Sequence, residues 1–397
     1  MVRMSAQPPT LVLKPGRDAH ILNHHHAIFQ TAVGTFPDCE DGSIVRVTAH
    51  DGTFLCFATL NRQAYICGRA ISFEDSDPMV SLQKNIERSI AIRTTFFAQE
   101  ETTAYRLINA EGDGIPGLVV DRYNDILVIQ CTTLGMDTLR EWVADLLIPL
   151  CKPKAIFEKS TGQARSKEGL QPREAWLRGK ADEEVTVKER GLQYKIKLVG
   201  SQKTGLFLDQ REMRSLVRSC AKDRTVLDCC SYVAGFSLSA LAGGALAADA
   251  VDYDAAALEQ AKQNMALNEV SPEKFAVYAQ DVFLFLRNRP LPRTYDFIIL
   301  DPPAFAKRSS DLEQAKKAYT DLNRLAMQVL PPGSLLLTCS CSFQVDAGLF
   351  QTIVFHAARQ AKRSVRILQR HRHAFDHPIN LFHPEVDYLK SLLLWIE

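Results

Sequence analysis

The sequence contains no pair of cysteines in the C-x-x-C spacing, although it has ten cysteines. Zinc ribbons and thioredoxin-like redox chemistry are therefore disfavoured. A chain of 397 residues does not need disulfides to hold its cores together, so we expect reduced thiols and a cytoplasmic protein. No apolar run reaches about 18 residues. The first residues, MVRMSAQPPTLVLKPG, contain no apolar h-region, so we expect neither a membrane span nor a signal peptide.

The sequence also has almost no net charge. It contains 47 basic and 46 acidic residues, which gives a formal charge of +1. This balance argues against a protein that binds nucleic acid by bulk charge alone, although it leaves room for a local basic groove. The hydrophobic fraction of 46% and the charged fraction of 23% are those of an ordinary globular protein. The length predicts two or three domains.

The first half of the chain shows two different patterns. Residues 1–75 contain short strand-like runs separated by Gly, Asp and Asn turns, which predicts a small β-rich domain. The polar segment 72–78 is typical of a linker. Residues 79–190 combine helical periodicity at 79–98 and 136–151 with strand-like runs, which predicts a middle α/β domain.

From about residue 203 onward, strand-like and helical segments alternate, and the strands are apolar. This alternation predicts a mostly parallel sheet that is covered by helices on both faces. We therefore expect an α/β protein whose last domain spans residues 191–397.

The segment TVLDCCSYVAGFSLSAL predicts a ligand site. Its strand ends at Asp228, Gly235 allows a close backbone approach, and a helix starts at Phe236. Ligands of doubly wound sheets bind at the carboxyl ends of the strands. The full G-x-G-x-x-G pattern is missing, which disfavours a dinucleotide. The next two strands end at Asp252 and Asp281, where carboxylates can accept hydrogen bonds from ribose hydroxyls and an adenine amino group. A helix N-cap explains each acid alone, but the set favours S-adenosylmethionine over NAD.

A second candidate site follows the apolar strand YDFIIL. Pro302 and Pro303 lack backbone N–H donors and fix φ, so the chain leaves the sheet as a stiff loop behind Asp301. Such a loop can hold the Asp301 carboxylate beside a flipped base, and Phe305 can stack on that base. The alternative is a rigid loop in which Phe305 is an ordinary core residue.

Cys339 and Cys341 lie at the end of another predicted strand, SLLLTCSCS. Side chains two residues apart share a face of a strand. An ionised cysteine can add to carbon 6 of cytosine, which makes carbon 5 nucleophilic enough to accept a methyl group. Asp301 can stabilise the charge that develops on the ring. The alternative is that both are buried structural cysteines.

Taken together, these segments resemble the ribosomal RNA large subunit methyltransferase I family, whose members are cytosine-5 RNA methyltransferases with an N-terminal PUA domain. The resemblance covers essentially the whole chain, in LVLKPGR, YRLINAEGDGIPGLVVDRY, QKTGLFLDQRE, VLDCCSYVAGFSL, DPPAFAK, TCSCS, DHP, HPE and YLK. It implies a PUA-like RNA-binding domain, a middle α/β domain and a C-terminal Rossmann-like class I methyltransferase domain. It also implies S-adenosylmethionine as cofactor and large-subunit (23S) ribosomal RNA as substrate. It allows a homodimer, and we expect neither membrane binding nor a bound metal.

The resemblance implies roles for particular residues. Cys341 is the implied nucleophile and Asp301 the implied base-contacting acid, whereas Cys339 receives no role. The implied cofactor contacts are Asp228, Tyr232, Gly235, Asp252, Asp281, Gln202, Asp209 and Arg211. The implied substrate contacts are Pro302, Pro303 and Phe305. Arg106 and Asp121 of the middle domain match as structural or RNA-contacting residues, without preference.

Two segments depart from the family pattern. The loop after the first strand reads YVAGF where the family usually has YTGGF. Ala234 therefore adds a methyl group, which would weaken cofactor binding if its φ is positive. The first domain lacks the HPWVF stretch and instead carries His24, His25 and His26. A consecutive run does not easily place three ligands on one ion, so we expect a solvated turn rather than a metal site.

Two alternative functions stay open on the sequence alone. An amino-methyltransferase acting on adenine or guanine also uses a D-P-P-F loop, but it needs no thiol. A ribosome-assembly protein that binds RNA without catalysis would explain the altered loop at Ala234. Full turnover after Cys341→Ala would show that the cytosine mechanism is wrong, and absence of S-adenosylmethionine binding would favour the non-catalytic protein.

Overall fold

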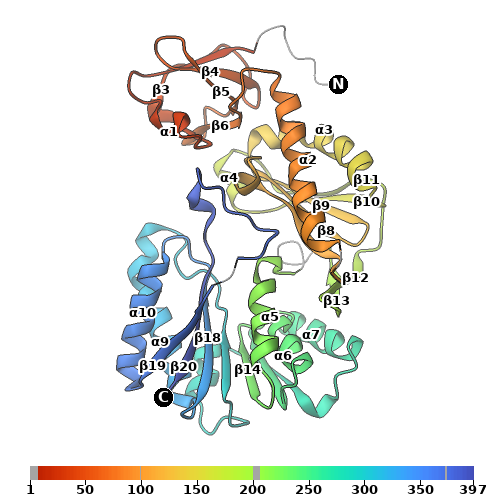
Figure 1. The fold of residues 1–397 in the computed structure, drawn as a ribbon, viewed down its shortest axis with the longest axis vertical. Helices are drawn as coiled ribbons and strands as arrows, with labels where there is room; N and C mark the ends of the chain where they lie inside the picture. Colours follow the sequence, from red (N-terminus) through yellow and green to blue (C-terminus); the bar gives the residue numbers. More distant parts are fainter. Residues whose placement is uncertain (1–7, 99, 200–205, 372) are drawn as a thin grey trace. The chain divides into compact units, whose positions relative to one another are not determined.

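In the computed structural model, which describes residues 8–98, 100–199, 206–371 and 373–397, the N-terminal runs form one six-stranded sheet (Figure 1). Its order is β2-β6-β5-β4-β1-β3, and only the pair β1–β4 is parallel. The strands are β1 (Thr10–Leu13), β2 (Ala27–Phe29), β3 (Val33–Thr35), β4 (Ile44–Thr48), β5 (Phe54–Leu60) and β6 (Ile66–Ser72), with a short helix α1 (Ala19–Leu22). Their inward side chains form a small apolar core, as the strand pattern predicted.

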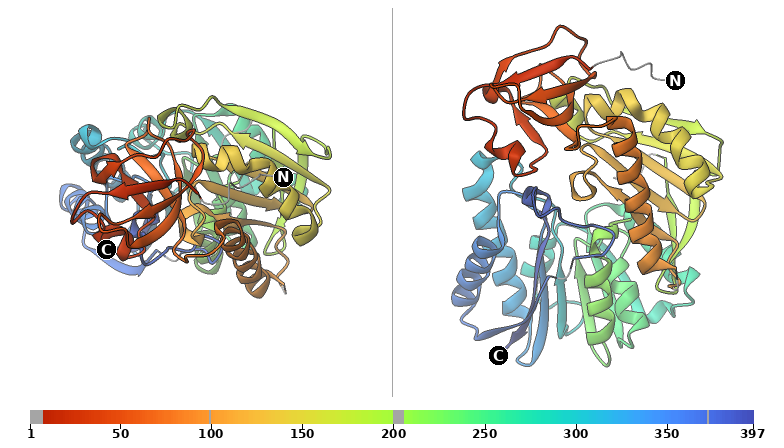
Figure 2. Two further views of the ribbon diagram at one scale, coloured as in Figure 1. Left: turned by 90° about the horizontal axis from the view of Figure 1, so that it is seen from above. Right: turned by 45° about the horizontal axis from the view of Figure 1, so that its top comes forward.

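The polar segment after β6 leads directly into helix α2 (Pro78–Phe97). The Asp77 side chain caps this helix by accepting a hydrogen bond from Met79 N at 2.8 Å, and Pro78 occupies the first turn. Residues of α2 share one apolar cluster with α3 (Leu134–Cys151) and with strands of the next sheet. In Figure 2 both helices run beside that sheet, in orange and yellow.

The next sheet has five strands in the order β11-β10-β9-β8-β7. They are β7 (Ala104–Asn109), β8 (Leu118–Tyr123), β9 (Ile126–Cys131), β10 (Ala155–Ser160) and β11 (Arg173–Arg178), and helix α4 (Ala164–Lys167) follows β10. Only β9 and β10 are parallel. Arg106 lies opposite Asp121 in the β7–β8 register, and its Nε donates to the fully buried Asp121 Oδ1 at 2.7 Å. These two residues therefore form a structural ion pair inside the sheet.

The C-terminal half forms a seven-stranded sheet in the order β16-β15-β14-β17-β18-β20-β19. The strands are β14 (Thr225–Cys229), β15 (Ala247–Asp252), β16 (Phe275–Ala279), β17 (Phe297–Leu300), β18 (Ser334–Ser340), β19 (Val365–Arg370) and β20 (Lys390–Ile396). β14 to β18 are mutually parallel, whereas β20 is antiparallel to both of its neighbours. This confirms the mostly parallel sheet, and the strand order reverses direction between β14 and β17, where such sheets bind ligands.

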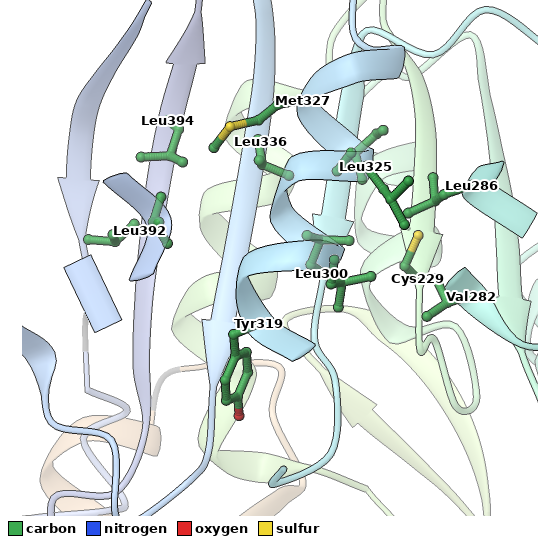
Figure 3. Close-up of a cluster of buried hydrophobic side chains, with 14 of the residues drawn as sticks. Cys229, Val282, Leu286, Leu300, Tyr319, Leu325, Met327, Leu336, Leu392 and Leu394 are labelled. Atoms are coloured by element: carbon green, nitrogen blue, oxygen red, sulfur yellow. The ribbon is translucent and has the colours of Figure 1, made fainter. Parts of the chain in front are cut away.

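Helices cover both faces of this sheet. They are α5 (Arg211–Cys220), α6 (Gly235–Ala242), α7 (Ala255–Leu267), α8 (Val282–Arg287), α9 (Leu312–Val329) and α10 (Ala347–Ala361). Neighbouring residues of β18 point to opposite faces: Leu336 joins the cluster formed with α8, α9 and α10, whereas Leu337 joins the cluster formed with α5 and α6. Figure 3 shows the first cluster, with Leu336 near Met327.

Contacts divide the chain into two units. One comprises Met1–Gly191, Ile196–Leu208 and Ala374–Val386, and the other comprises Leu192–Lys195, Asp209–His373 and Asp387–Glu397. The boundary runs through β13 (Leu192–Lys197), which pairs with β12 (Glu184–Glu189). The three consecutive domains remain a prediction, since the unit containing the first two also includes Ala374–Val386. None of the described helices combines the length and apolar character that crossing a membrane requires.

Candidate active site

The loop between β14 and α6 has an unusual backbone. Cys230, Tyr232 and Ala234 have φ angles of +59°, +50° and +58°, in the left-handed region that costs a residue with a side chain roughly 1–2 kcal/mol. The condition that makes Ala234 unfavourable, a positive φ, is therefore met. Gly235 has no positive φ, but a Cβ there would lie 3.2 Å from Arg214 Cδ. The glycine thus permits a close approach to a side chain of α5.

Asp252 connects this loop to the end of β15. Its Oδ2 accepts a hydrogen bond from Tyr232 N at 2.8 Å, and its Oδ1 accepts one from Asp254 N at 2.9 Å. Asp254 in turn caps α7. The structure therefore brings Tyr232 and Asp252 together. Burial raises the pKa of the Tyr232 hydroxyl to about 12, so this side chain stays neutral at physiological pH.

Asp228 is fully buried at the end of β14. Its Oδ2 accepts hydrogen bonds from the backbone N (3.0 Å) and the Oγ (2.9 Å) of Ser237 in α6. Among the described residues its Oδ1 has no hydrogen-bond partner. Burial raises the pKa of this carboxyl to about 7. A buried acceptor without a partner indicates a group that a proton, a water molecule or a ligand completes.

The other residues predicted to contact the cofactor differ in burial and in hydrogen-bond partners. Asp281 is exposed and caps α8, because its Oδ1 accepts a hydrogen bond from Leu284 N at 3.0 Å. The N-cap alternative therefore describes the observed role of Asp281. Asp209 accepts a hydrogen bond from the Tyr388 hydroxyl, and Arg211 is fully buried in the first turn of α5. Gln202 lies outside the described residues.

Asp301 follows β17, and its backbone N donates to Cys229 O at 3.3 Å. Its Oδ1 accepts a hydrogen bond from Gln210 Nε2 at 3.0 Å. The sequence reasoning missed Gln210, although it lies between the predicted residues Asp209 and Arg211. Because the buried Gln210 amide contacts the carboxylate, it fixes the direction in which the acid points.

The loop after Asp301 contains the three predicted substrate contacts. Pro302 is buried and Pro303 is exposed. The Phe305 ring packs against Tyr319 of α9, with ring centroids 4.7 Å apart. The core alternative therefore describes the contacts that Phe305 makes in this structure, and stacking on a base stays a prediction.

The two cysteines of the T-C-S-C-S segment lie in different surroundings. Cys341 is half-buried, and its Sγ lies 3.7 Å from the carbonyl oxygen of Pro302. Cys339 is fully buried in the apolar cluster beside α5, where burial raises the pKa of its thiol well above the usual range. The alternation rule that placed both on one face stops applying because β18 ends at Ser340. Cys341 contacts the loop that carries Asp301 through Pro302, whereas Cys339 lies deeper, where Asp301 raises the pKa of its thiol further.

Serines on both sides of Cys341 hold its backbone in place. The Tyr319 hydroxyl lies 3.0 Å from Ser340 Oγ and 2.9 Å from Ser342 Oγ. Ser342 Oγ also accepts a hydrogen bond from Ala306 N at 3.2 Å. This buried network joins the segment of Cys341 to the loop of Asp301 and to α9. The S-C-S pattern is the sequence signal that could have indicated it, but the partner Tyr319 could not be identified from the sequence.

A cluster of histidines lies in the N-terminal unit. His25 Nε2 lies 3.3 Å from Glu385 Oε2, the His383 ring stacks on the His25 ring, and the three ligand atoms lie within 4.8 Å of one another. Ala27 N donates to His25 Nδ1 at 3.1 Å, so Nε2 carries the proton and donates to Glu385. In a metal-bound histidine, the ring nitrogen that does not bind the ion normally donates a hydrogen bond, whereas His25 Nδ1 accepts one. The expected solvated turn is wrong for His26, which is only 5% exposed.

Known protein families and relatives match this chain over almost its whole length. A family described as S-adenosylmethionine-dependent methyltransferase matches residues 164–389, and a family described as PUA-like domain matches residues 11–73. The ribosomal RNA large subunit methyltransferase I of Shewanella denitrificans is 37% identical over 389 residues, which cover 96% of this chain and 98% of that protein. The protein of the same name from Aliivibrio fischeri strain MJ11 is 36% identical over 387 residues, with the same coverage.

Solved structures show the same fold. The chain superimposes on a solved structure from Streptococcus mutans that is described as a SAM-dependent methyltransferase. The TM-score is 0.83 at 24% identity, and the superposition covers 97% of this chain and 99% of that one. The protein SMU.776, solved with SAH, gives a TM-score of 0.84 at 24% identity and the same coverage. The buried Asp228, the half-buried Asp252 and the loop at the ends of β14 and β15 fit an adenosyl ligand, because they place acceptors where parallel strands bind one.

Proposed function

The chain belongs to the ribosomal RNA large subunit methyltransferase I family and uses S-adenosylmethionine, and from this premise we propose that it forms 5-methylcytosine in large-subunit (23S) ribosomal RNA through a covalent bond between Cys341 and the cytosine. The observation that carries the proposal is the 3.7 Å contact between Cys341 Sγ and Pro302 O, next to Asp301. It puts a half-buried thiol and an acid at neighbouring strand ends. The PUA-like domain at residues 11–73 is the proposed RNA-binding module.

The chemistry of cytosine explains why both groups are needed. S-adenosylmethionine, when bound, supplies an electrophilic methyl group, but carbon 5 of cytosine is too weak a nucleophile to take it. The Cys341 thiolate adds to carbon 6, and the electron pair of the C5–C6 double bond moves to carbon 5, which then accepts the methyl group. A base then accepts the carbon 5 proton, and the electron pair of that C–H bond reforms the C5–C6 double bond as the bond between sulfur and carbon 6 breaks. The thiolate is thereby returned.

Asp301 has a separate task in this sequence. Adding a thiolate to the ring changes the charge on the ring nitrogen and the exocyclic amine, and a fixed carboxyl beside them stabilises that change. Gln210 holds the carboxyl through its hydrogen bond to Oδ1, so little reorganisation is needed during reaction. Pro302, Pro303 and Phe305 stay our proposed contacts to the base.

The cofactor contacts are proposed for the carboxyl ends of β14 to β16. The joined pair Asp252 and Tyr232 and the partly unsatisfied Asp228 support this placement. Asp252 lies at the position where a carboxylate would accept hydrogen bonds from the ribose. The remaining proposed contacts are Gly235, Asp281, Gln202, Asp209 and Arg211.

The proposal is tested by trapping. A 23S fragment containing 5-fluorocytidine is incubated with the protein and S-adenosylmethionine, and a covalent complex is sought on a denaturing gel. Fluorine at carbon 5 cannot leave as a proton does, so elimination is blocked and the adduct accumulates. We expect the adduct in the wild type and in Cys339→Ala, and none in Cys341→Ala.

The matched variants separate the alternatives. Cys339 is a buried cysteine two residues from Cys341, so it controls for general damage to this strand. An adduct that persists in Cys341→Ala refutes the assignment of the nucleophile. Full turnover by Cys341→Ala would instead favour an amino-methyltransferase, and absence of S-adenosylmethionine binding would favour a non-catalytic protein.

A further inference from the structure

Lys390 begins β20 and lies opposite Ser340 in the β18–β20 register. Its side chain is therefore anchored beside the end of the strand that leads to Cys341. The Lys390 Nζ donates to Ser342 O at 2.8 Å and to Tyr388 O at 2.7 Å. The residue is only 8% exposed. Such a lysine is held in place, unlike the solvated lysines of a protein surface.

The two carbonyls hold the Lys390 ammonium against the residue that follows the proposed nucleophile in the chain. An ammonium group has three N–H donors, and these two hydrogen bonds use two of them. Burial lowers the pKa of Lys390 below its usual value, although the interactions with Asp387, Cys341 and Asp346 act in the opposite direction. The interaction of Lys390 with the thiolate is reciprocal, because a charge that stabilises the ammonium is itself stabilised by it.

We propose that Lys390 is a positioning residue, whose fixed ammonium keeps Cys341 ionised at neutral pH. This inference rests on the proposed function, in which Cys341 must be a thiolate before it can add to carbon 6. The carbonyl oxygens of Ser342 and Tyr388 set the location of the charge, and the β18–β20 pairing sets the location of the carbonyls. Lys390 therefore acts through Cys341 and needs no contact with the base.

Several acidic or neutral groups also lie near Cys341 or Lys390 among the described residues. Asp301 precedes Pro302, whose carbonyl oxygen faces the sulfur. The Tyr319 hydroxyl approaches from α9, where burial raises its pKa and keeps it neutral. Asp387 and Asp346 interact with Lys390 and favour its charged form. Removing the charge of Lys390 thus takes a positive charge away from the surroundings of Cys341.

The ionisation of the Cys341 thiol can be measured by alkylation, without RNA or cofactor. The full-length protein is treated with iodoacetamide over a range of pH, and modification of each cysteine is followed by peptide mass spectrometry. Lys390→Met removes the charge at similar length, and Lys390→Arg keeps it. We expect Cys341 in Lys390→Met to react about 10-fold more slowly at pH 7, with its pH midpoint raised by about one unit. Lys390→Arg should stay close to wild type.

Cys220, a half-buried thiol at the end of α5, is the reference in the same samples. Wild-type Cys341 should titrate at lower pH than Cys220, and an equal midpoint overturns the proposal even if a variant fails to fold. An unchanged Cys341 profile in folded Lys390→Met also overturns it. In turnover, Lys390→Met should lower kcat at pH 7, regain much of it at high pH and leave KM for RNA unchanged.

The outcomes separate this inference from the proposed function. If alkylation depends on Lys390 but no 5-fluorocytidine adduct forms, the thiol is activated and the proposed reaction is wrong. If the adduct forms and the alkylation profile of Cys341 does not depend on Lys390, the proposed reaction stands and the proposed role of Lys390 is wrong.

Discussion

The strand ends of β14 and β15 use their acids differently from the strand ends of β17 and β18. In the first region the acids shape the backbone: Asp252 holds two backbone N–H groups, and Asp228 holds the first turn of α6. In the second region Ser340, Ser342 and Tyr319 shape the backbone. Cys341 and Asp301 lie on the backbone segments that these residues hold. Changes in the first region should therefore alter binding and stability, whereas changes in the second should alter rate.

The largest effect is expected for Asp301→Asn. Loss of the carboxyl group that stabilises the charge developing on the base should lower the single-turnover rate by about 10²–10³-fold. The affinity for S-adenosylmethionine should stay near that of the wild type, because the change lies outside the first region. Rapid-quench kinetics at saturating cofactor and calorimetric titration measure the two quantities. An equal loss of rate and cofactor affinity would break the comparison.

The next effect concerns Asp228, whose pKa in the folded protein is raised to about 7 by burial. Between about pH 4 and pH 7 the folded state then binds more protons than the unfolded state, so stability falls as pH rises through this window. Asp228→Asn removes the titration. We expect the wild type to lose about 2 kcal/mol more than the variant between pH 5 and pH 8, measured by urea denaturation. Parallel curves would show that Asp228 ionises normally.

A third change sharpens the contrast from the binding side. Asp252→Ala removes the acceptor of two backbone N–H groups and the proposed ribose contact. We expect cofactor binding to weaken by about 1–3 kcal/mol, as for other charged hydrogen bonds. The rate at saturating cofactor should change little. Unchanged affinity in the titration would make Asp252 a structural residue only.

The smallest effect is expected at Ala234. Its φ of +58° suits glycine, so Ala234→Gly should stabilise the protein by about 1 kcal/mol. Ala240→Gly is the matched control in the interior of α6, where glycine should destabilise by a similar amount or more. Thermal and urea unfolding report both. A loss of stability in Ala234→Gly would show that neighbouring contacts require the methyl group.

Local patterns predicted much of the fold. Helical periodicity indicated α2, α3 and α7, and apolar runs indicated the parallel strands β14 to β18. The position of β20 could not be predicted, because an antiparallel strand inserted between β18 and β19 is selected by pairing across the sheet and not by its own sequence. The packing of Ala374–Val386 with the N-terminal unit has the same origin.

The site shows the same division. Asp301 and Cys341 follow strands that the sequence identifies, and the structure places them at adjacent strand ends. Gln210, Tyr319 and Lys390 were missed as contributors. Each of them matters through contacts with residues far away in the sequence, and no local pattern carries that information.

The insertion of β20 also bears on how the chain reaches its folded state. All seven residues of β18 are buried, and β20 supplies its partner on one side. Until β20 arrives, β18 is an apolar edge with unpaired backbone groups, which is a template for self-association. Substitutions that loosen this pair should therefore appear first as insoluble aggregates, so the strand that leads to the nucleophile also needs protection during folding.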